Sequence, residues 1–160
     1  MTTSPQTPQS KESDDLKLTF HRVLIRKRQA VPLSEGSVKA GFPSPAQDYL
    51  AGEIDLNDIL VRHPEGTFYV RVSGDSMRDA AILDGDLAVV DREVEPRDGD
   101  FVIAFLDGEP TIKQFRLSPD GRSGWLQPWN NAYPRIPVTA DDDFRIWGVV
   151  THVVHTLHRP

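Results

Sequence analysis

The chain alternates apolar and polar residues in short runs, a pattern typical of strands that bury one face. Such runs predict strands at residues 18–25, 67–73, 86–91, 100–106, 111–117, 125–128 and 144–155. Turn signals separate several of these runs, among them the pairs Asp84-Gly85 and Asp107-Gly108, and Asp-Gly between apolar runs favours a tight turn. Short strands joined by tight turns indicate a mainly β fold, with an antiparallel body that is barrel-like or a sandwich.

Little helix is expected beside these strands. Asp55 is a plausible N-cap for a short helix over residues 56–61, which the breakers at 63–66 would end. The alternating run of Phe68, Val70 and Val72 stops at Gly74, and residues 76–80 then fit a short helical turn. We therefore predict one or two short helices in a β body.

The N-terminal part of the chain has a different character. Residues 1–15 are rich in Thr, Ser, Pro and Gln without apolar periodicity, which predicts disorder. Pro32, Gly36 and small polar residues extend this interpretation, and the prolines at 43 and 45 hold their neighbours extended. We expect two parts: a flexible arm over residues 1–40 and a folded domain over residues 41–160.

Charge divides the chain in a similar way. Residues 1–40 carry 7 basic and 4 acidic residues, a net +3, and residues 41–160 carry 11 and 20, a net −9, which together give the total of −6. An acidic domain repels a phosphate backbone, so direct DNA binding by the folded domain is not expected. The basic cluster at residues 26–28 is interpreted as solvated rather than as a nucleic-acid contact.

Composition narrows the setting further. The chain has no cysteine, which excludes disulfides and cysteine-ligated metal and suits a reducing compartment. No stretch approaches the roughly 18 apolar residues that a membrane span needs, and the N-terminus lacks a secretory signal pattern. We expect a cytoplasmic protein without a membrane anchor.

Two residues carry the candidate chemistry. Ser76 follows a predicted strand in Ser-Gly-Asp-Ser-Met, and Lys113 lies in a second strand with Thr111, Phe115 and Leu117 on its face. An amine among apolar neighbours loses hydration, and its pKa falls until the neutral form can take a proton from a hydroxyl. The pattern predicts a serine-lysine catalytic pair that needs no metal and no other cofactor.

The start of a helical turn after the serine would supply a second element of the site. Backbone N–H groups at such a start point toward incoming negative charge. The N–H groups of Ser76 and Met77 are therefore candidates for an oxyanion hole. Two other interpretations stay open at this point, namely that Ser76 is only an N-cap and that Lys113 snorkels to solvent.

Other polar and aromatic residues are interpreted as structural. His155 would face away from its two neighbouring histidines in a strand, so a metal site at His152, His155 and His158 is not favoured. Asp75 is expected to cap the backbone that follows it. The three tryptophans are expected to fill the core or a dimer surface: Trp125, Trp129 and Trp147.

A series of motifs then resembles one known family. In chain order they are Ala40-Gly41-Phe42-Pro43-Ser44-Pro45-Ala46, Asp48-Tyr49, Ile54-Asp55-Leu56-Asn57, the serine motif at 73–77, Asp84-Gly85-Asp86-Leu87, Asp107-Gly108-Glu109 before Thr111 and Lys113, Asn130 with Ala132-Tyr133, and the runs at 148–150 and 152–154. Over residues 41–160 this series is similar to the LexA/UmuD family of self-cleaving serine-lysine peptidases. The spacings from residue 40 to 76 and from 76 to 113 also match that family.

The resemblance implies specific roles. Ser76 would attack the carbonyl of Ala40, Lys113 would take the serine proton and later supply one to the Gly41 amine, and water would release the acyl-enzyme. RecA filaments on single-stranded DNA would promote this step. The shortened homodimer would then join a UmuC-like Y-family polymerase in error-prone translesion synthesis during the SOS response. Lys39 departs from the apolar residue expected before the bond, and the arm is longer than the resemblance implies.

Two competing functions remain. A LexA-like repressor would need a helix-turn-helix ahead of Ala40, where Pro32, Gly36 and the polar tail leave no room for three helices. A non-catalytic, polymerase-binding scaffold would keep Ser76 and Lys113 only as structure. Alkaline pH separates this scaffold from a peptidase, because deprotonation of Lys113 should raise cleavage only if the pair is catalytic.

Overall fold

The computed structural model describes residues 19–23, 29–34 and 50–158. The predicted cleavage site, Ala40 and Gly41, lies outside the described residues, as do the polar segment at 1–15 and the basic cluster at 26–28. Within the described ranges, no helix is long and apolar enough to cross a membrane.

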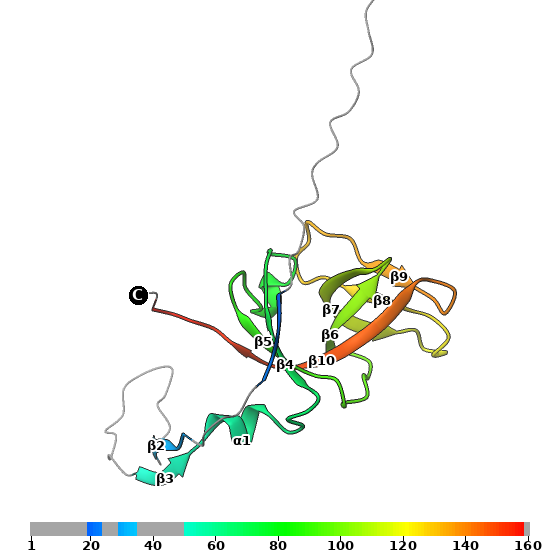
Figure 1. The fold of residues 1–160 in the computed structure, drawn as a ribbon. Coiled ribbons are helices and arrows are strands. Elements are labelled where there is room, and N and C mark those ends of the chain that lie inside the picture. Colours follow the sequence, from blue (N-terminus) through cyan, green and yellow to red (C-terminus); the bar gives the residue numbers. More distant parts are fainter. Residues whose placement is uncertain (1–18, 24–28, 35–49, 159–160) are drawn as a thin grey trace, which may run out of the picture.

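Antiparallel strands are the main regular structure of the described residues, with little helix beside them, so the predicted mainly β fold is confirmed. Eight of them form one open sheet in the order β1-β4-β5-β10-β6-β7-β8-β9, and β2 and β3 form a separate pair (Figure 1). The strands are β1 (Thr19–Arg22), β2 (Val31–Ser34), β3 (Leu50–Ile54), β4 (Thr67–Arg71), β5 (Leu87–Asp91), β6 (Phe101–Leu106), β7 (Glu109–Leu117), β8 (Gly124–Gln127), β9 (Ile136–Val138) and β10 (Phe144–Val154).

Two hydrophobic clusters stabilise the large sheet. Because side chains alternate along a strand, adjacent residues of β6 join different clusters: Ile103 the first, Val102 and Ala104 the second. The first cluster adds Val70, Val72, Met77, Ile82, Ala88, Val90 and Ile112, and the second adds Leu126, Val138 and Val149. The centre of the sheet is therefore buried on both faces.

This arrangement corrects one detail of the predicted alternation in β7. The sequence pattern assigned Lys113 and Phe115 to an apolar face and Ile112 to the other. Lys113 is indeed buried, but Ile112 is only 1% exposed and belongs to the first cluster. Both faces of β7 are therefore covered around Ile112 and Lys113, because side chains from distant strands and turns pack on each side of the sheet.

The helical predictions agree with the structure. Helix α1 (Leu56–Leu60) begins after Asp55, whose carboxylate accepts a hydrogen bond from the Asn57 N–H at 2.9 Å. The turn predicted after Ser76 is a single 3₁₀ turn, η1 (Arg78–Ala80). Short strands at β3 and β9 were not predicted, because each is too brief to show clear alternation.

The predicted arm contains regular structure where the chain is described. Residues of β1 pair with β4, and Val31 to Ser34 pair antiparallel with β3, from Val31 opposite Ile54 to Ser34 opposite Leu50. The backbone N–H of Gln29 also donates a hydrogen bond to the Asp55 carboxylate at 2.8 Å, which connects the segment before β2 to the start of α1. The composition around Pro32 did not predict this strand, and proline is tolerated in such a two-stranded edge pairing. The flexibility of the arm stays a prediction.

Candidate active site

Ser76 lies in the turn that connects β4 to η1. Gly74 has φ of 91°, a conformation that side-chain-bearing residues rarely adopt, and its N–H donates to the Asp84 carboxylate at 2.9 Å. This glycine lets the chain leave β4 sharply and return across the sheet. Lys113 is held in the middle of β7, opposite Val102 of β6.

The structure brings the two predicted residues together. The Lys113 Nζ lies 3.0 Å from the Ser76 Oγ, across 37 residues of sequence. The serine is 3% exposed and the lysine 6% exposed. The simple snorkelling interpretation of Lys113 is excluded by this burial, and the serine hydroxyl contacts the lysine amine rather than capping a helix.

The remaining contacts of the amine define its orientation. Nζ also lies 2.8 Å from the Thr111 Oγ1 and 3.0 Å from the Ile112 carbonyl oxygen. A neutral amine has two N–H groups and one lone pair. If the N–H groups go to the Thr111 hydroxyl and the Ile112 carbonyl, the lone pair is left for the Ser76 hydroxyl proton.

Burial sets the protonation of this amine. It lowers the pKa of Lys113 from 10.5 to about 8, because the charged form loses hydration. Within the described ranges, no acidic side chain forms an ion pair with Lys113 to oppose this effect. A substantial fraction of the amine is therefore neutral near physiological pH.

The backbone at the serine fits the predicted oxyanion role in one respect. Ser76 and Met77 are both buried, and neither backbone N–H donates a hydrogen bond to another group in the described part of the chain. Their carbonyls are engaged: Trp129 donates to Ser76, and Ala80 donates to Met77. Among the described residues the two N–H groups are thus uncommitted, whereas the carbonyls of Asp75, Ser76 and Met77 accept hydrogen bonds.

A distant segment, residues 129–133, clamps the serine turn. The Trp129 N–H donates to the Ser76 carbonyl at 2.9 Å, and the Asp79 N–H donates to the Trp129 carbonyl at 2.9 Å. The buried Asn130 donates through Nδ2 to the Asp75 carbonyl at 3.1 Å and accepts from the Ala132 N–H at 3.0 Å. Sequence reasoning assigned this clamp no structural role, although Asn130 and Ala132-Tyr133 belong to the motifs of the family resemblance.

Asp75 differs from its prediction. Its carboxylate accepts a hydrogen bond from the Tyr133 hydroxyl at 2.7 Å and lies 4.0 Å from the Arg78 guanidinium. Within the described residues it does not cap the following backbone, because Tyr133 reaches it from the clamp. Thr111 is a further residue that sequence reasoning left without a role, although it contacts the lysine amine.

The histidines and tryptophans have structural partners. The three C-terminal histidines form no metal-binding cluster within the described ranges, and His155 pairs with the buried Asp86. Trp147 packs edge-on against Phe20. Trp129 is 41% exposed and its indole donates to Gln114 on β7, so it lies outside the core, and its predicted place at a dimer surface stays a prediction.

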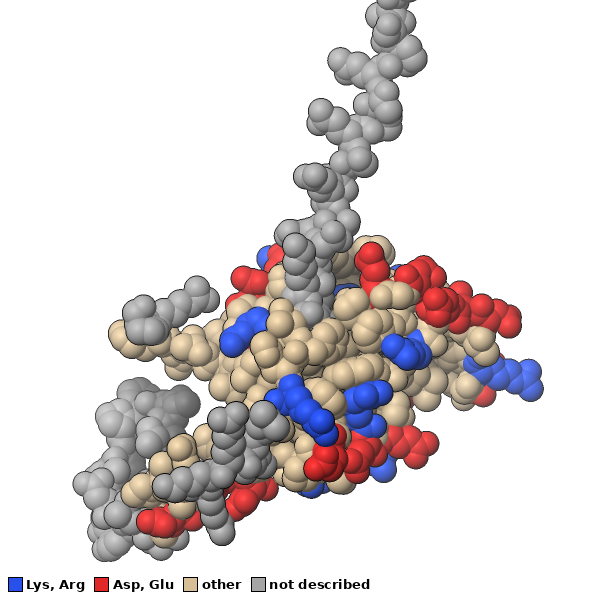
Figure 2. All heavy atoms as spheres, viewed as in Figure 1, with Lys and Arg blue, Asp and Glu red and all other residues tan. Residues whose placement is uncertain are grey.

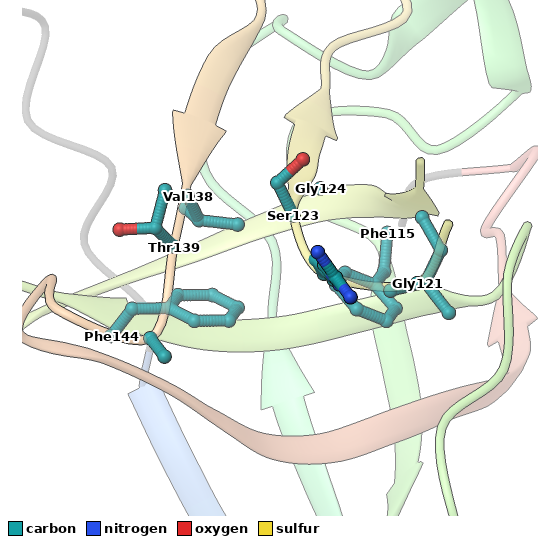
Figure 3. A pocket seen from close by; sticks show the side chains of 10 residues that line it. Phe115, Gly121, Ser123, Gly124, Val138, Thr139 and Phe144 are labelled. Atoms are coloured by element: carbon teal, nitrogen blue, oxygen red, sulfur yellow. The ribbon is translucent and has the colours of Figure 1, made fainter. Parts of the chain in front are cut away.

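A separate pocket, with a volume of about 210 Å³, lies where the end of β7 meets β8, β9 and the start of β10. Figure 3 shows Phe115 and Phe144 on its floor and Ser123 and Thr139 at its sides. Gly121, Gly124 and Val138 also line it. Neither Ser76 nor Lys113 lines this pocket, so it is distinct from the buried pair.

Comparison with known proteins gives consistent matches. The family described as Peptidase S24-like matches residues 32–151. Protein ImpA of Salmonella typhimurium is 44% identical over 78% of this chain and 83% of its own length. Protein SamA of the same species is 44% identical over 80% and 87%, and MucA of Escherichia coli is 42% identical over 77% and 83%. These relatives are UmuD-family proteins, which confirms the resemblance drawn from the motifs.

A repressor also matches, but over a smaller part of its length. The LexA repressor of Acidothermus cellulolyticus is 42% identical over 80% of this chain and 44% of the repressor. The similarity therefore covers the part of that repressor which this chain shares with the UmuD-family proteins. More than half of the repressor has no counterpart in the match.

Proposed function

Because this chain belongs to the Peptidase S24-like family, we propose that it is a serine-lysine peptidase that cuts its own Ala40–Gly41 bond. One observation carries the proposal: the buried Lys113 amine lies 3.0 Å from the buried Ser76 hydroxyl and has a pKa lowered to about 8. The same family and UmuD-family relatives support this assignment.

The chemistry follows from the roles of the two side chains. The neutral Lys113 amine accepts the Ser76 proton as the serine oxygen attacks the Ala40 carbonyl carbon. The N–H groups of Ser76 and Met77 stabilise the negative charge on the former carbonyl oxygen. The Lys113 ammonium then protonates the departing Gly41 nitrogen, and a water molecule, deprotonated by the same amine, hydrolyses the ester and regenerates the serine.

The residues at the proposed bond suit a recessed nucleophile. Ala40 is small and Gly41 has no side chain, so the backbone can approach a serine that is 3% exposed. In the sequence, the bond falls between Ser34 and Leu50, two residues that pair across β2 and β3. Cleavage would thus separate residues 1–40 from the domain formed by residues 41–160.

Incubation of the purified full chain tests the proposal. We expect a fragment whose N-terminal sequence begins Gly-Phe-Pro-Ser, and we expect Ser76→Ala and Lys113→Ala to reduce its formation at least 100-fold while circular dichroism stays unchanged. Asp79→Ala, a change on an exposed residue of the neighbouring turn, is the matched control for a nonspecific effect. Persistent cleavage at this bond in folded Ser76→Ala protein would contradict the proposal.

We further propose that cleavage is promoted by RecA on single-stranded DNA and that the shortened homodimer serves a UmuC-like Y-family polymerase in SOS mutagenesis. Support comes from the UmuD-family relatives. Adding RecA filaments should accelerate cleavage at least tenfold, with RecA lacking DNA as the control. Equal rates with and without filaments would rule out this regulation and leave the peptidase chemistry untouched.

A further inference from the structure

Strand β1 occupies an unusual position, because it comes from residues ahead of the proposed cleavage bond yet belongs to the sheet of the folded domain. Among the described strands it lies at the sheet edge and pairs with β4 alone, from Thr19 opposite Arg71 to Arg22 opposite Phe68. Figure 1 shows β1 in blue, running beside β4 across the front of the body. Removing β1 would leave the backbone groups along one side of β4 without a strand partner.

Phe20 of β1 packs on a cluster of three aromatic rings of the body, which we call the aromatic slot: Phe68, Phe105 and Trp147. The Phe20 ring meets Trp147 edge-on, with centroids 4.8 Å apart, and stacks on Phe105 at 6.3 Å. The Phe68 ring packs on Trp147 in turn, with centroids 5.1 Å apart. Such contacts favour an aromatic side chain over an aliphatic one at this position.

The aromatic slot keeps supports that do not depend on β1. The Arg92 guanidinium lies 4.8 Å from the Trp147 ring centroid and donates to the Trp147 carbonyl at 3.2 Å. The Arg145 guanidinium lies 4.9 Å from the Phe105 ring centroid. These cation–π contacts hold two of the three rings in place from the body itself. Figure 2 shows basic side chains over the middle of this face, with acidic ones at its right-hand end and along its lower edge.

The contacts made by β1 also define a sequence preference. Arg22, two residues after Phe20, donates to Glu65 at 3.0 Å, and Val23 is 8% exposed. Thr19, His21 and Arg22 are all exposed, so the ion pair of Arg22 with Glu65 lies at the surface. The occupied site therefore recognises an aromatic residue, a basic residue two positions later and an apolar residue after that, in extended conformation.

Strand β1 is short and only partly buried, so its attachment depends on the rest of the chain. Only four residues pair, and three of them are exposed. While β1 is tethered to the domain, its effective concentration at β4 is on the order of millimolar or higher. A cut between β2 and β3 removes that advantage, and the same strand must then bind as a separate fragment.

We propose that the β4 edge with the aromatic slot is a docking site for an extended peptide of the pattern aromatic-x-basic-apolar, filled by residues 20–23 in the intact chain and opened to a partner strand by cleavage. Peptides bind sheet edges in this way in other proteins, with backbone bonds giving affinity and side-chain slots giving specificity. The opening step rests on the proposed function, whereas the docking site does not.

A peptide-binding experiment tests the site without any self-cleavage. The full chain with Ser76→Ala is prepared in two forms, with Phe20 intact and with Phe20→Ala, and each is titrated against a fluorescently labelled synthetic peptide of residues 16–26. We expect saturable binding to the Phe20→Ala form, at least tenfold tighter than to the form whose own strand fills the site. Thr19→Ala, on the exposed face of the same strand, is the matched control and should behave as the intact form.

The peptide itself supplies a second comparison that cannot disturb folding. A peptide in which Phe20 is replaced by alanine should bind the vacated site at least tenfold more weakly. Absence of saturable binding, equal binding to both protein forms, or equal binding of the two peptides would each overturn the docking site.

A second experiment tests whether the covalent link between β1 and the domain keeps the site filled. The recognition sequence of another protease is inserted within residues 35–39 of the Ser76→Ala chain. After the nick, with both pieces still present, the affinity for the labelled peptide should rise at least tenfold above that of the unnicked chain. An unchanged affinity would overturn the opening by cleavage. Because the nick is made by another enzyme, this result does not depend on whether Ser76 is a nucleophile.

Discussion

At the scale of single residues, the lysine amine shows how burial is used for chemistry. Lowering its pKa from 10.5 to about 8 means that folding destabilises the charged form by roughly 3 kcal/mol relative to the neutral form. Below pH 8 the folded protein bears this cost in full. It diminishes as the pH rises toward 10.5, where the amine is neutral in the unfolded chain as well.

The pH dependence of cleavage should follow this amine. Because the neutral form is the base, the fraction available rises with pH through about 8. We expect the first-order rate of self-cleavage to increase about tenfold between pH 7 and pH 9 and then level off. Time courses across this range measure it, with the Ser76→Ala chain at each pH as the control. A rate that falls or stays flat would exclude Lys113 as the base.

Thr111 should act as a positioning residue for the same amine, since its hydroxyl lies 2.8 Å from Nζ. In Thr111→Val, one N–H loses its acceptor, so we expect the plateau rate to fall about tenfold. Loss of this hydrogen bond destabilises the charged amine more than the neutral one, which lowers the pKa of Lys113. The midpoint of the pH profile should therefore move below that of the unaltered chain. Thr111→Ser should restore both quantities. An unchanged plateau and midpoint would assign Thr111 to structure alone.

At the scale of elements, the contact between β7 and β8 determines where the lysine strand lies. Gly124 of β8 pairs with Leu117 of β7, and a Cβ at Gly124 would come within 2.4 Å of the Arg116 carbonyl oxygen. Backbone cannot yield as a flexible side chain can. The absence of a side chain at this one position therefore allows the two strands to pair beside the site.

Gly124→Ala should disturb this pairing. We expect the free energy of unfolding to fall by about 1–3 kcal/mol, because the backbone of β7 or β8 must shift to admit the methyl group. Urea titration followed by circular dichroism measures the change. Ser123→Ala, at the exposed neighbouring position, is the control and should stay within about 0.5 kcal/mol of the unaltered chain. Equal stability of both variants would show that the strands can separate at no cost.

At the scale of the whole molecule, the site depends on segments far apart in sequence. The turn with Ser76, the strand with Lys113 and the clamp at residues 129–133 meet only because the sheet brings them together. Asn130 is buried and joins the clamp to the Asp75 carbonyl, 55 residues away. The position of the nucleophile is thus set by two parts of the chain at once.

Asn130→Ala should loosen the nucleophile and leave the base intact. We expect the cleavage rate to fall at least tenfold, since the serine turn loses the Asp75 contact and a small displacement of the oxygen is costly. The midpoint of the pH profile should stay near 8, because the contacts of Lys113 are unaffected. Asn131→Ala, on the exposed neighbour, is the matched control. A normal rate in Asn130→Ala would remove the clamp from the mechanism.

Much of the described fold follows from local sequence patterns. The alternating runs predicted β1, β4 to β8 and β10, and the Asp55 cap predicted α1, because these features depend on residues close in sequence. The pairing of β2 with β3 was missed for the opposite reason. Val31 and Ile54 meet across 23 residues of chain, and neither run is long enough to show a period.

By itself, the sequence determined the strand content, the family resemblance and the identity of Ser76 and Lys113 as partners, since each rests on residue types and their spacing. Only the tertiary structure decided that the amine is buried, that Thr111 and the Ile112 carbonyl orient it, and that residues 129–133 hold the serine turn. The physical reason is that burial and hydrogen bonding belong to atoms that approach in space, and their approach depends on the packing of the whole sheet.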